Sequence, residues 1–136
     1  MRRAMPAGVM TALLSGSTLL WPSANTEAEE HVTLPTLTAT AQLGADLFAA
    51  NCSGCHGENG GGTDQGPPLI HAIYNPGHHA DYSFVLAARN GVRAHHWRFG
   101  NMPPQPQVTE AQVMAIVRYV REVQQANGIT DRQHRM

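Results

Sequence analysis

The chain has 136 residues, enough for one small domain, and its nine basic and ten acidic side chains give a formal net charge of −1. All nine basic residues are arginines, and this balance excludes the strongly basic surface typical of a nucleic-acid-binding protein. Thirteen glycines and nine prolines indicate a loop-rich domain. The small core of such a domain is expected to depend on a cofactor, a metal ion or a disulfide.

The first 24 residues have the pattern of a secretory signal peptide. Two arginines follow the initial methionine, residues 7–21 are mostly apolar, and small residues come next. The apolar stretch is short for a membrane span, which needs about 20 residues, so membrane attachment is expected only if this segment stays as an uncleaved anchor. We therefore predict cleavage after Ala24 or Ala28 and a periplasmic or otherwise exported protein.

Residues 25–40 mix an acidic cluster with threonines and are predicted to form a flexible lead-in. The folded domain is expected over residues 41–127, with residues 128–136 as a tail. Its first helix is predicted over 41–51, with Thr38 or Thr40 as its cap. The apolar face of this helix is expected to contain Leu43, Leu47 and Phe48.

Two further helices are predicted, separated by long segments rich in glycine and proline. One covers residues 81–90 and stops at Gly91. Its inward residues are expected to be Phe84, Val85 and Ala88. The last helix starts with a capping box of Thr109 and Gln112 and stops at Gly128. Its apolar stripe consists of Val113, Ile116, Val117 and Val120. Since no segment alternates like a strand, the domain is predicted to be all-α, with three main helices.

Residues 52–56 read Cys-Ser-Gly-Cys-His, the C-x-x-C-H spacing of a c-type haem attachment site. Two thiols at this spacing can bond to the two vinyl groups of one haem edge, and the adjacent histidine can reach the iron. A redox-active dithiol is expected within a βαβ pattern, which is absent. A structural zinc site needs four ligands, and there is no second cysteine pair. We predict one haem c bound covalently by Cys52 and Cys55, with His56 as an iron ligand.

With this motif, residues 41–127 resemble a class I, mono-haem cytochrome c of the exported bacterial kind, which implies long loops wrapped around the haem. Residues 66–69, Gly-Pro-Pro-Leu, resemble the family's Gly-Pro-x-Leu segment. The resemblance implies that the Pro67 carbonyl accepts a hydrogen bond from the His56 imidazole and that Leu69 packs on the haem. Such a hydrogen bond fixes the ring and raises its basicity as a ligand. A plain proline turn is the alternative.

The first and last predicted helices also resemble a pair that crosses closely in this family. Gly44 and Phe48 match the first helix of that pair, and Ile116 and Tyr119 match the last. In the family, a glycine allows the close approach. The resemblance implies that this contact is structural.

The second axial ligand is predicted to be Met102, because Gly-Asn-Met-Pro-Pro at 100–104 resembles the family's Met-Pro ligand loop. A core methionine or a mobile loop residue is the alternative for Met102. Met114 lies beside the apolar stripe of the last helix and is interpreted as a core residue, and Met136 is terminal. The histidines after the motif are also candidates: His71, His78, His79, His95, His96 and His134.

Trp97 and Arg98 are predicted haem contacts, because an indole N–H and a guanidinium are good donors to a haem propionate, as in other family members. His95 and His96 lie just before Met102, so either is an alternative ligand of the iron or a propionate donor. The histidine-rich middle of the chain also suggests a second metal such as copper, or simply surface histidines.

The leading hypothesis is a one-electron carrier between Fe(III) and Fe(II), or the electron-transfer subunit of a larger exported complex. With both axial positions filled, we expect no small-molecule substrate and no enzymatic activity. The partners are expected to be redox proteins of unknown identity, and the absence of lysine departs from family members that dock through lysines. The alternatives are a gas-binding or peroxide-type haem protein with an open sixth position, and a periplasmic metal-binding module that uses the histidines.

Overall fold

The computed structural model describes residues 31–131, and this part of the chain is all-α, as predicted. Its α-helices are α1 (Ala39–Asn51), α2 (Ser53–His56), α3 (Asp81–Asn90) and α4 (Glu110–Ala126). Two 3-10 turns, η1 (Glu58–Gly60) and η2 (Ala72–Tyr74), lie between α2 and α3. Within residues 31–131 there is no strand, only an isolated antiparallel bridge between Val92 and Met102.

The predicted helix ends are confirmed at their caps. The Thr38 side chain accepts a hydrogen bond from the Ala41 N–H at the start of α1. Thr109 and Gln112 form the reciprocal capping box that starts α4. Gly91, at φ 73°, ends α3 in a conformation that glycine adopts without strain.

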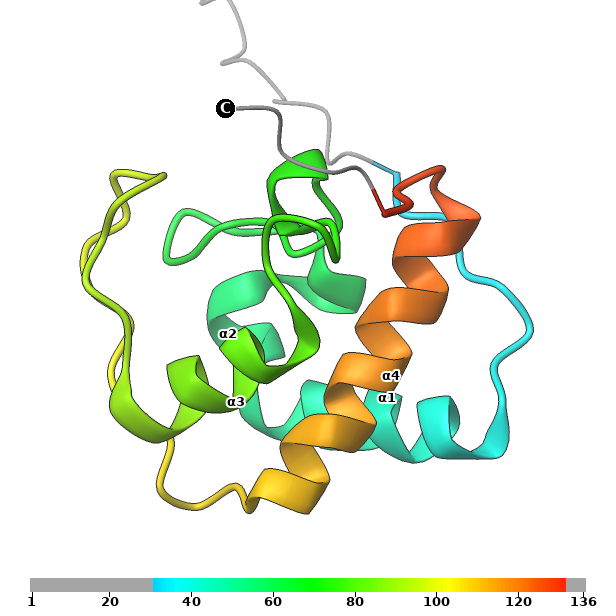
Figure 1. Ribbon diagram of the computed structural model, residues 1–136, viewed down its shortest axis with the longest axis horizontal. Helices are drawn as coiled ribbons and strands as arrows, with labels where there is room; N and C mark the ends of the chain where they lie inside the picture. Colours follow the sequence, from blue (N-terminus) through cyan, green and yellow to red (C-terminus); the bar gives the residue numbers. More distant parts are fainter. Residues whose placement is uncertain (1–30, 132–136) are drawn as a thin grey trace, which may run out of the picture.

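The core lies where α1 crosses α4, and the two helices run across each other near the base of the molecule (Figure 1). The predicted stripe of α4 is buried at Val113, Ile116, Val117 and Val120. Phe48 of α1 packs on Tyr119 of α4, with ring centroids 5.6 Å apart. On α3, Val85 is buried against α4, and Phe84 and Ala88 pack partly buried beside it, as expected.

Two apolar residues predicted to be in the core are not. Leu43 is 56% exposed, because the inward face of α1 is formed by Ala41, Gly44 and Phe48. Small residues at the crossing carry little hydrophobic signal, so the sequence pattern favoured the larger leucine beside them. Met114 is 42% exposed on the solvent side of α4, so the core interpretation of this methionine is also wrong.

The described part of the expected lead-in contacts α4. Thr33 exchanges two hydrogen bonds with the Asn127 side chain, of 3.0 and 2.8 Å. Thr38 donates through its backbone N–H and its hydroxyl to the Glu122 carboxylate, at 3.0 and 2.7 Å. Val32 and Leu37 pack against the core, and α1 begins two residues before the domain boundary that we predicted.

The predicted signal peptide, residues 1–24, and Met136 lie outside the described residues. Among residues 31–131, no helix combines the length and the apolar character needed to cross a membrane.

Candidate cofactor site

The two cysteines and the adjacent histidine lie at the junction of α1 and α2. Cys52 ends α1 with a 2.8 Å hydrogen bond from its N–H to the Phe48 carbonyl, and its own carbonyl accepts from Cys55 and His56. This single helical turn, which we did not predict, brings Cys52 and Cys55 to neighbouring positions on one face. Both are free thiols, Cys52 half-buried and Cys55 exposed. Burial, and secondarily the Cys55 charge, raises the pKa of the Cys52 thiol to about 11.

The glycine-rich loop after α2 wraps closely around this motif. The Gly62 N–H donates to the His56 carbonyl at 2.6 Å, and the Thr63 hydroxyl donates to the Cys55 carbonyl at 2.5 Å. A Cβ on Gly66 would lie 2.8 Å from that Cys55 oxygen, so a side chain at this position has no room. From the sequence, these glycines predicted only a loop, whereas the structure shows that position 66 requires a glycine.

The His56 imidazole is oriented by the hydrogen bond that the resemblance implied. Its Nδ1 lies 2.9 Å from the Pro67 carbonyl oxygen, and since a carbonyl only accepts, Nδ1 carries the proton. Burial lowers the pKa of His56, and the bond to Pro67 opposes this shift. The ring is thus held neutral, with the lone pair on Nε2.

Leu69, the other predicted residue of this segment, is buried in the main core. Its N–H donates to the Gly60 carbonyl at 2.8 Å, and its carbonyl accepts from the side-chain amide of Gln124 at 2.9 Å. Gln124 is fully buried on α4 and was missed by sequence analysis. Its polar position within an otherwise apolar stripe was the signal. Through Gln124, α4 fixes the segment that orients His56.

Met102 is half-buried at the base of a loop that leaves α3 as a separate arm, yellow in Figure 1. Its backbone exchanges two hydrogen bonds of 2.9 Å with Val92, which close the loop between them. Inside the loop, the Asn101 side chain accepts from the Ala94 N–H at 3.0 Å. Gly91 packs so closely that a Cβ there would lie 2.6 Å from the Met102 carbonyl oxygen. The methionine therefore sits at the anchored end of the loop.

Trp97 joins the Met102 loop to the segment that holds His56. Its ring meets His71 edge-on, with centroids 5.1 Å apart, and His71 directly follows the buried pair Leu69 and Ile70. The Trp97 indole N–H is buried and has no hydrogen-bond partner in the described part of the chain. Burial raises the pKa of the nearby Tyr74 hydroxyl, and the proximity of the Trp97 indole lowers it in part. The indole N–H and the Tyr74 hydroxyl do not, however, have the geometry of a hydrogen bond. Arg98, the other predicted donor, is exposed.

Four histidines gather beside this loop. His95 and His96 belong to it, and His78 and His79 belong to the segment before α3. The pKa of His79 and that of His96 are lowered, first by desolvation and then by the neighbouring imidazoles. The structure thus brings together four of the histidines that the sequence left unassigned.

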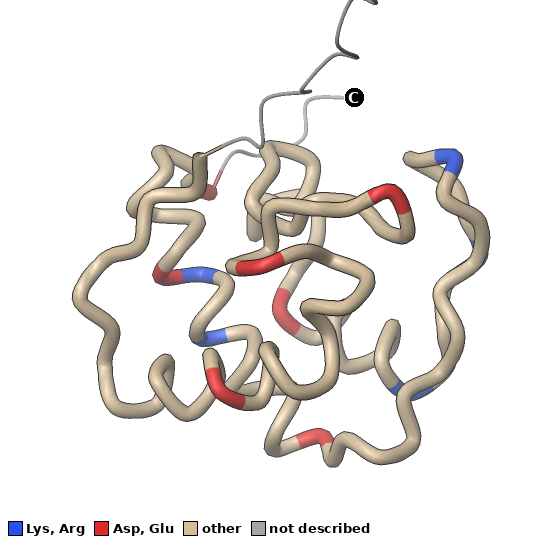
Figure 2. The backbone as a smooth tube through the Cα atoms, turned by 180° about the vertical axis from the view of Figure 1, so that it is seen from behind, with Lys and Arg blue, Asp and Glu red and all other residues tan. Residues whose placement is uncertain are grey.

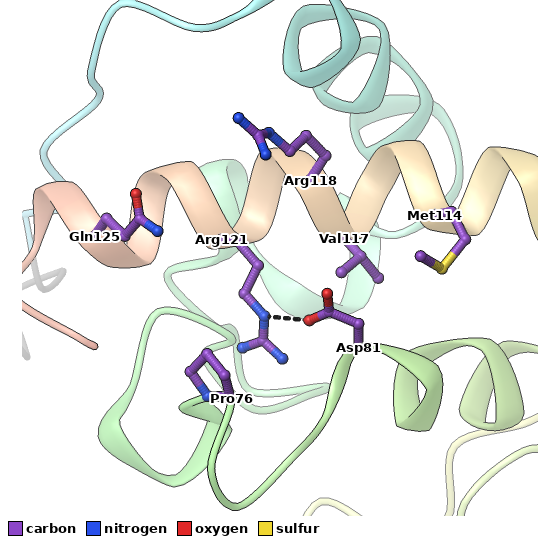
Figure 3. A pocket seen from close by; sticks show the side chains of 7 residues that line it. All are labelled: Pro76, Asp81, Met114, Val117, Arg118, Arg121 and Gln125. Atoms are coloured by element: carbon purple, nitrogen blue, oxygen red, sulfur yellow. Dashed lines mark hydrogen bonds and ion pairs between the residues drawn. The ribbon is translucent and has the colours of Figure 1, made fainter. Parts of the chain in front are cut away.

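Arg121 is a second buried polar residue that sequence analysis missed. Its guanidinium donates to Asp81 at 2.8 Å, to the Tyr74 carbonyl at 2.6 Å, and to the His79 carbonyl. It also lies over the Phe84 ring, 5.1 Å from its centroid. Figure 3 shows Arg121 and Asp81 meeting in a hollow between α4, the start of α3 and the loop at Pro76. Arg121 therefore attaches the histidine-bearing segment to α4.

The thiols, the imidazole and the thioether described above are the groups that a c-type haem requires. The chain offers two free thiols at the attachment spacing, one imidazole with Nε2 available, and one anchored thioether. The orphaned N–H of Trp97 is suited to an acceptor such as a propionate oxygen. Each of these groups is of the type that haem attachment and axial ligation require.

Comparison with known families agrees with this chemistry. The family model described as cytochrome c matches residues 41–124, most of the part that the structure describes. No curated protein and no solved structure gives a significant match to the chain. The match covers the C-x-x-C-H motif, both anchored loops and the crossing of α1 and α4. The chain therefore belongs to the cytochrome c family, whose members bind haem and take part in electron transfer.

Proposed function

We propose that this protein is a one-electron carrier with a single haem c, attached through Cys52 and Cys55 and ligated by His56 and Met102. The observation that carries the proposal is the 2.9 Å hydrogen bond from His56 Nδ1 to the Pro67 carbonyl. It leaves Nε2 as the one ring nitrogen able to bind a metal. When bound, the haem supplies an iron that accepts and releases one electron.

The chain holds the two segments that carry the proposed iron ligands in fixed positions. The Pro67 segment is held to α4 through Gln124, and the Met102 loop is closed through Val92 and followed by two prolines. Proline fixes its own φ, so the Met102 side chain has limited freedom to swing away. Ligands that stay in place in both oxidation states keep structural rearrangement small during electron transfer. This argument favours a carrier over a haem protein with an open sixth position.

The redox partners are proposed to approach the Met102 loop and to present negative charge. Between Asp81 and Glu110 the chain has no acidic residue. The same stretch contains three arginines, Arg89 at the end of α3 and Arg93 and Arg98 on the loop (Figure 2). Positive charge is therefore concentrated on the loop although the whole chain is slightly acidic. Such local charge steers association with an oppositely charged surface.

Export is proposed on the pattern of residues 1–24, with the haem attached to the exported chain. Amino-terminal sequencing of the mature holoprotein tests this. Cleavage after Ala24 or Ala28 is the expected result, and an intact Met1 in protein from the exported fraction would instead support an anchor.

Covalent attachment is tested by extracting the purified holoprotein with acidified acetone. The thioether bonds of Cys52 and Cys55 should keep the haem on the wild-type chain, whereas Cys52→Ala with Cys55→Ala should release it. Ser53→Ala, a change between the two cysteines, is the matched control and should retain the haem. If acid acetone strips the haem from the wild type, the attachment assignment is wrong.

A further inference from the structure

Three imidazoles from two separate loops converge at the surface beside the Met102 loop. The ligand nitrogens of His78, His79 and His96 all lie within 4.8 Å of one another. His78 and His96 are exposed, and His79 is half-buried. We propose that these three histidines form a binding site for one divalent first-row transition-metal ion, in addition to the haem iron.

The spacing fits a metal ion shared by the ligands. The Nε2 atoms of His78 and His96 are 3.3 Å apart. Two nitrogen ligands bound at about 2.0–2.1 Å to a tetrahedral zinc ion lie roughly 3.3–3.4 Å from each other. These two rings therefore already have the separation that a shared ion requires, and only small side-chain rotations are needed to bring in the third.

His79 is oriented for binding by the backbone. Its Nδ1 donates to the Ile73 carbonyl at 2.8 Å, which leaves Nε2 with the lone pair. Metal-binding histidines usually donate their second ring N–H to a carbonyl or carboxylate in this way. The hydrogen bond from Arg121 to the His79 carbonyl holds the backbone beneath the ring. This support is already present in the structure and does not depend on a metal.

The third ligand comes from the loop that ends at Met102. His96 lies within the loop closed by the Val92–Met102 bridge and by the bond from Ala94 to Asn101. An ion held by His78, His79 and His96 would thus cross-link this loop to the segment before α3. The site would restrain the loop that carries the proposed axial methionine.

The donor set selects the class of ion. Three neutral imidazoles suit zinc, copper and nickel, whereas magnesium and calcium require oxygen ligands. The cluster contains no carboxylate, and Arg121 is paired with Asp81 beside it. A fourth coordination position remains for water. We therefore expect zinc and copper to bind and magnesium not to bind.

Calorimetric titration of the oxidised holoprotein with Zn²⁺ tests the site, because zinc has no redox chemistry. We expect one ion per chain in the wild type. Loss of a supporting partner typically lowers metal affinity about 10–100-fold, so loss of a ligand in His78→Ala, His79→Ala or His96→Ala should weaken binding by at least about 100-fold. His31→Ala, which removes an exposed histidine elsewhere, and His95→Ala should bind as the wild type does.

Hydrogen exchange provides a readout that does not depend on the haem ligands. Zn²⁺ should slow amide exchange over residues 92–102 in the wild type and leave it unchanged in His96→Ala. Because His78 and His96 are exposed, their removal leaves the core intact, and an unchanged haem spectrum verifies this. The proposal is overturned if the wild type binds no zinc, if binding survives in His96→Ala, or if His31→Ala or His95→Ala abolishes it.

Discussion

Gly44 lies directly against the backbone of Ala115 where α1 crosses α4. A Cβ on Gly44 would overlap the Ala115 carbonyl oxygen, and it would lie 2.6 Å from the carbonyl carbon and 3.0 Å from the Tyr119 Cβ. Two of these atoms belong to the backbone of a helix and cannot move aside alone. The close crossing of the helices, and with it the position of the Phe48–Tyr119 pair, therefore requires glycine at position 44.

Replacing Gly44 with leucine should destabilise the holoprotein strongly. Overpacking of this kind costs about 1–3 kcal/mol or more in the free energy of unfolding. Gln42→Leu places the same side chain on the exposed face of α1 and should change the free energy of unfolding by less than about 0.5 kcal/mol. Denaturant titration of both variants measures this difference, and equal stabilities would contradict the crossing described above.

Gly91 controls the base of the Met102 loop. Its φ of 73° is costly for any residue with a side chain, and a Cβ would also press on the Met102 carbonyl and Pro104. Gly91→Ala should lower the free energy of unfolding by at least about 1–2 kcal/mol. It should also weaken the sulfur-to-iron charge-transfer band in the optical spectrum, which the proposed ligation by Met102 would produce. Asn90→Ala, one residue earlier in α3 and exposed, should leave the band intact. A full-strength band in Gly91→Ala would show that the loop anchor does not position the methionine.

Arg121 and Arg118 provide a matched pair on α4. Arg121 is buried and donates to the Asp81 carboxylate and to two backbone carbonyls. The Arg118 side chain is 56% exposed, and its Nε lies 2.6 Å from the Glu122 carboxylate. Arg121→Leu removes the guanidinium from the Asp81 carboxylate and from the His79 carbonyl, while the Tyr74 carbonyl keeps only the Gln124 amide as a donor. The substitution should cost about 2–4 kcal/mol. Arg118→Leu should cost about 0.5 kcal/mol or less. Thermal unfolding of the two holoproteins measures both, and a small effect at Arg121 would mean that the segment 74–79 is held in another way.

The arginines near the loop should govern electron exchange with charged reagents. Arg98→Glu should slow oxidation of the reduced protein by the hexacyanoferrate(III) anion and accelerate oxidation by a cationic cobalt complex. Stopped-flow rates at low salt measure the effect, which added salt should reduce because it screens exposed charges. Arg118→Glu makes the same change of charge on α4 and should alter both oxidation rates less than Arg98→Glu does. If the two variants behave alike, electrons do not leave through the Met102 loop.

The sequence was sufficient where the signal is local. Capping residues and apolar periodicity predicted α3 and α4 almost to the residue. The C-x-x-C-H motif is likewise visible in five consecutive residues, and haem attachment there stays a prediction. The sequence failed where burial depends on a distant partner. Leu43 is exposed because Gly44 faces α4. The close crossing of the two helices, and not the hydrophobicity of the residues, determines which face of α1 is buried.

The candidate site shows the same division. Cys52, His56 and Met102 are recognisable from their immediate neighbours in the sequence. Gln124 and Arg121, which hold the loops, form hydrogen bonds with residues about 40–55 positions away in the sequence. In the sequence they are visible only as polar residues that interrupt the apolar face of α4. The convergence of His78, His79 and His96 likewise depends on how two loops meet.

The most direct test of the proposed carrier is the effect of Met102→Ala on the optical spectrum and on ligand binding by the haem. A neutral sulfur donor favours Fe(II), so its loss should remove the charge-transfer band, lower the reduction potential and allow fast binding of cyanide or carbon monoxide. Met114→Leu, on the exposed side of α4, should change none of these. The account would be contradicted if Met102→Ala kept the wild-type spectrum while His95→Ala or His96→Ala lost the sixth ligand, because the iron would then be held by two histidines.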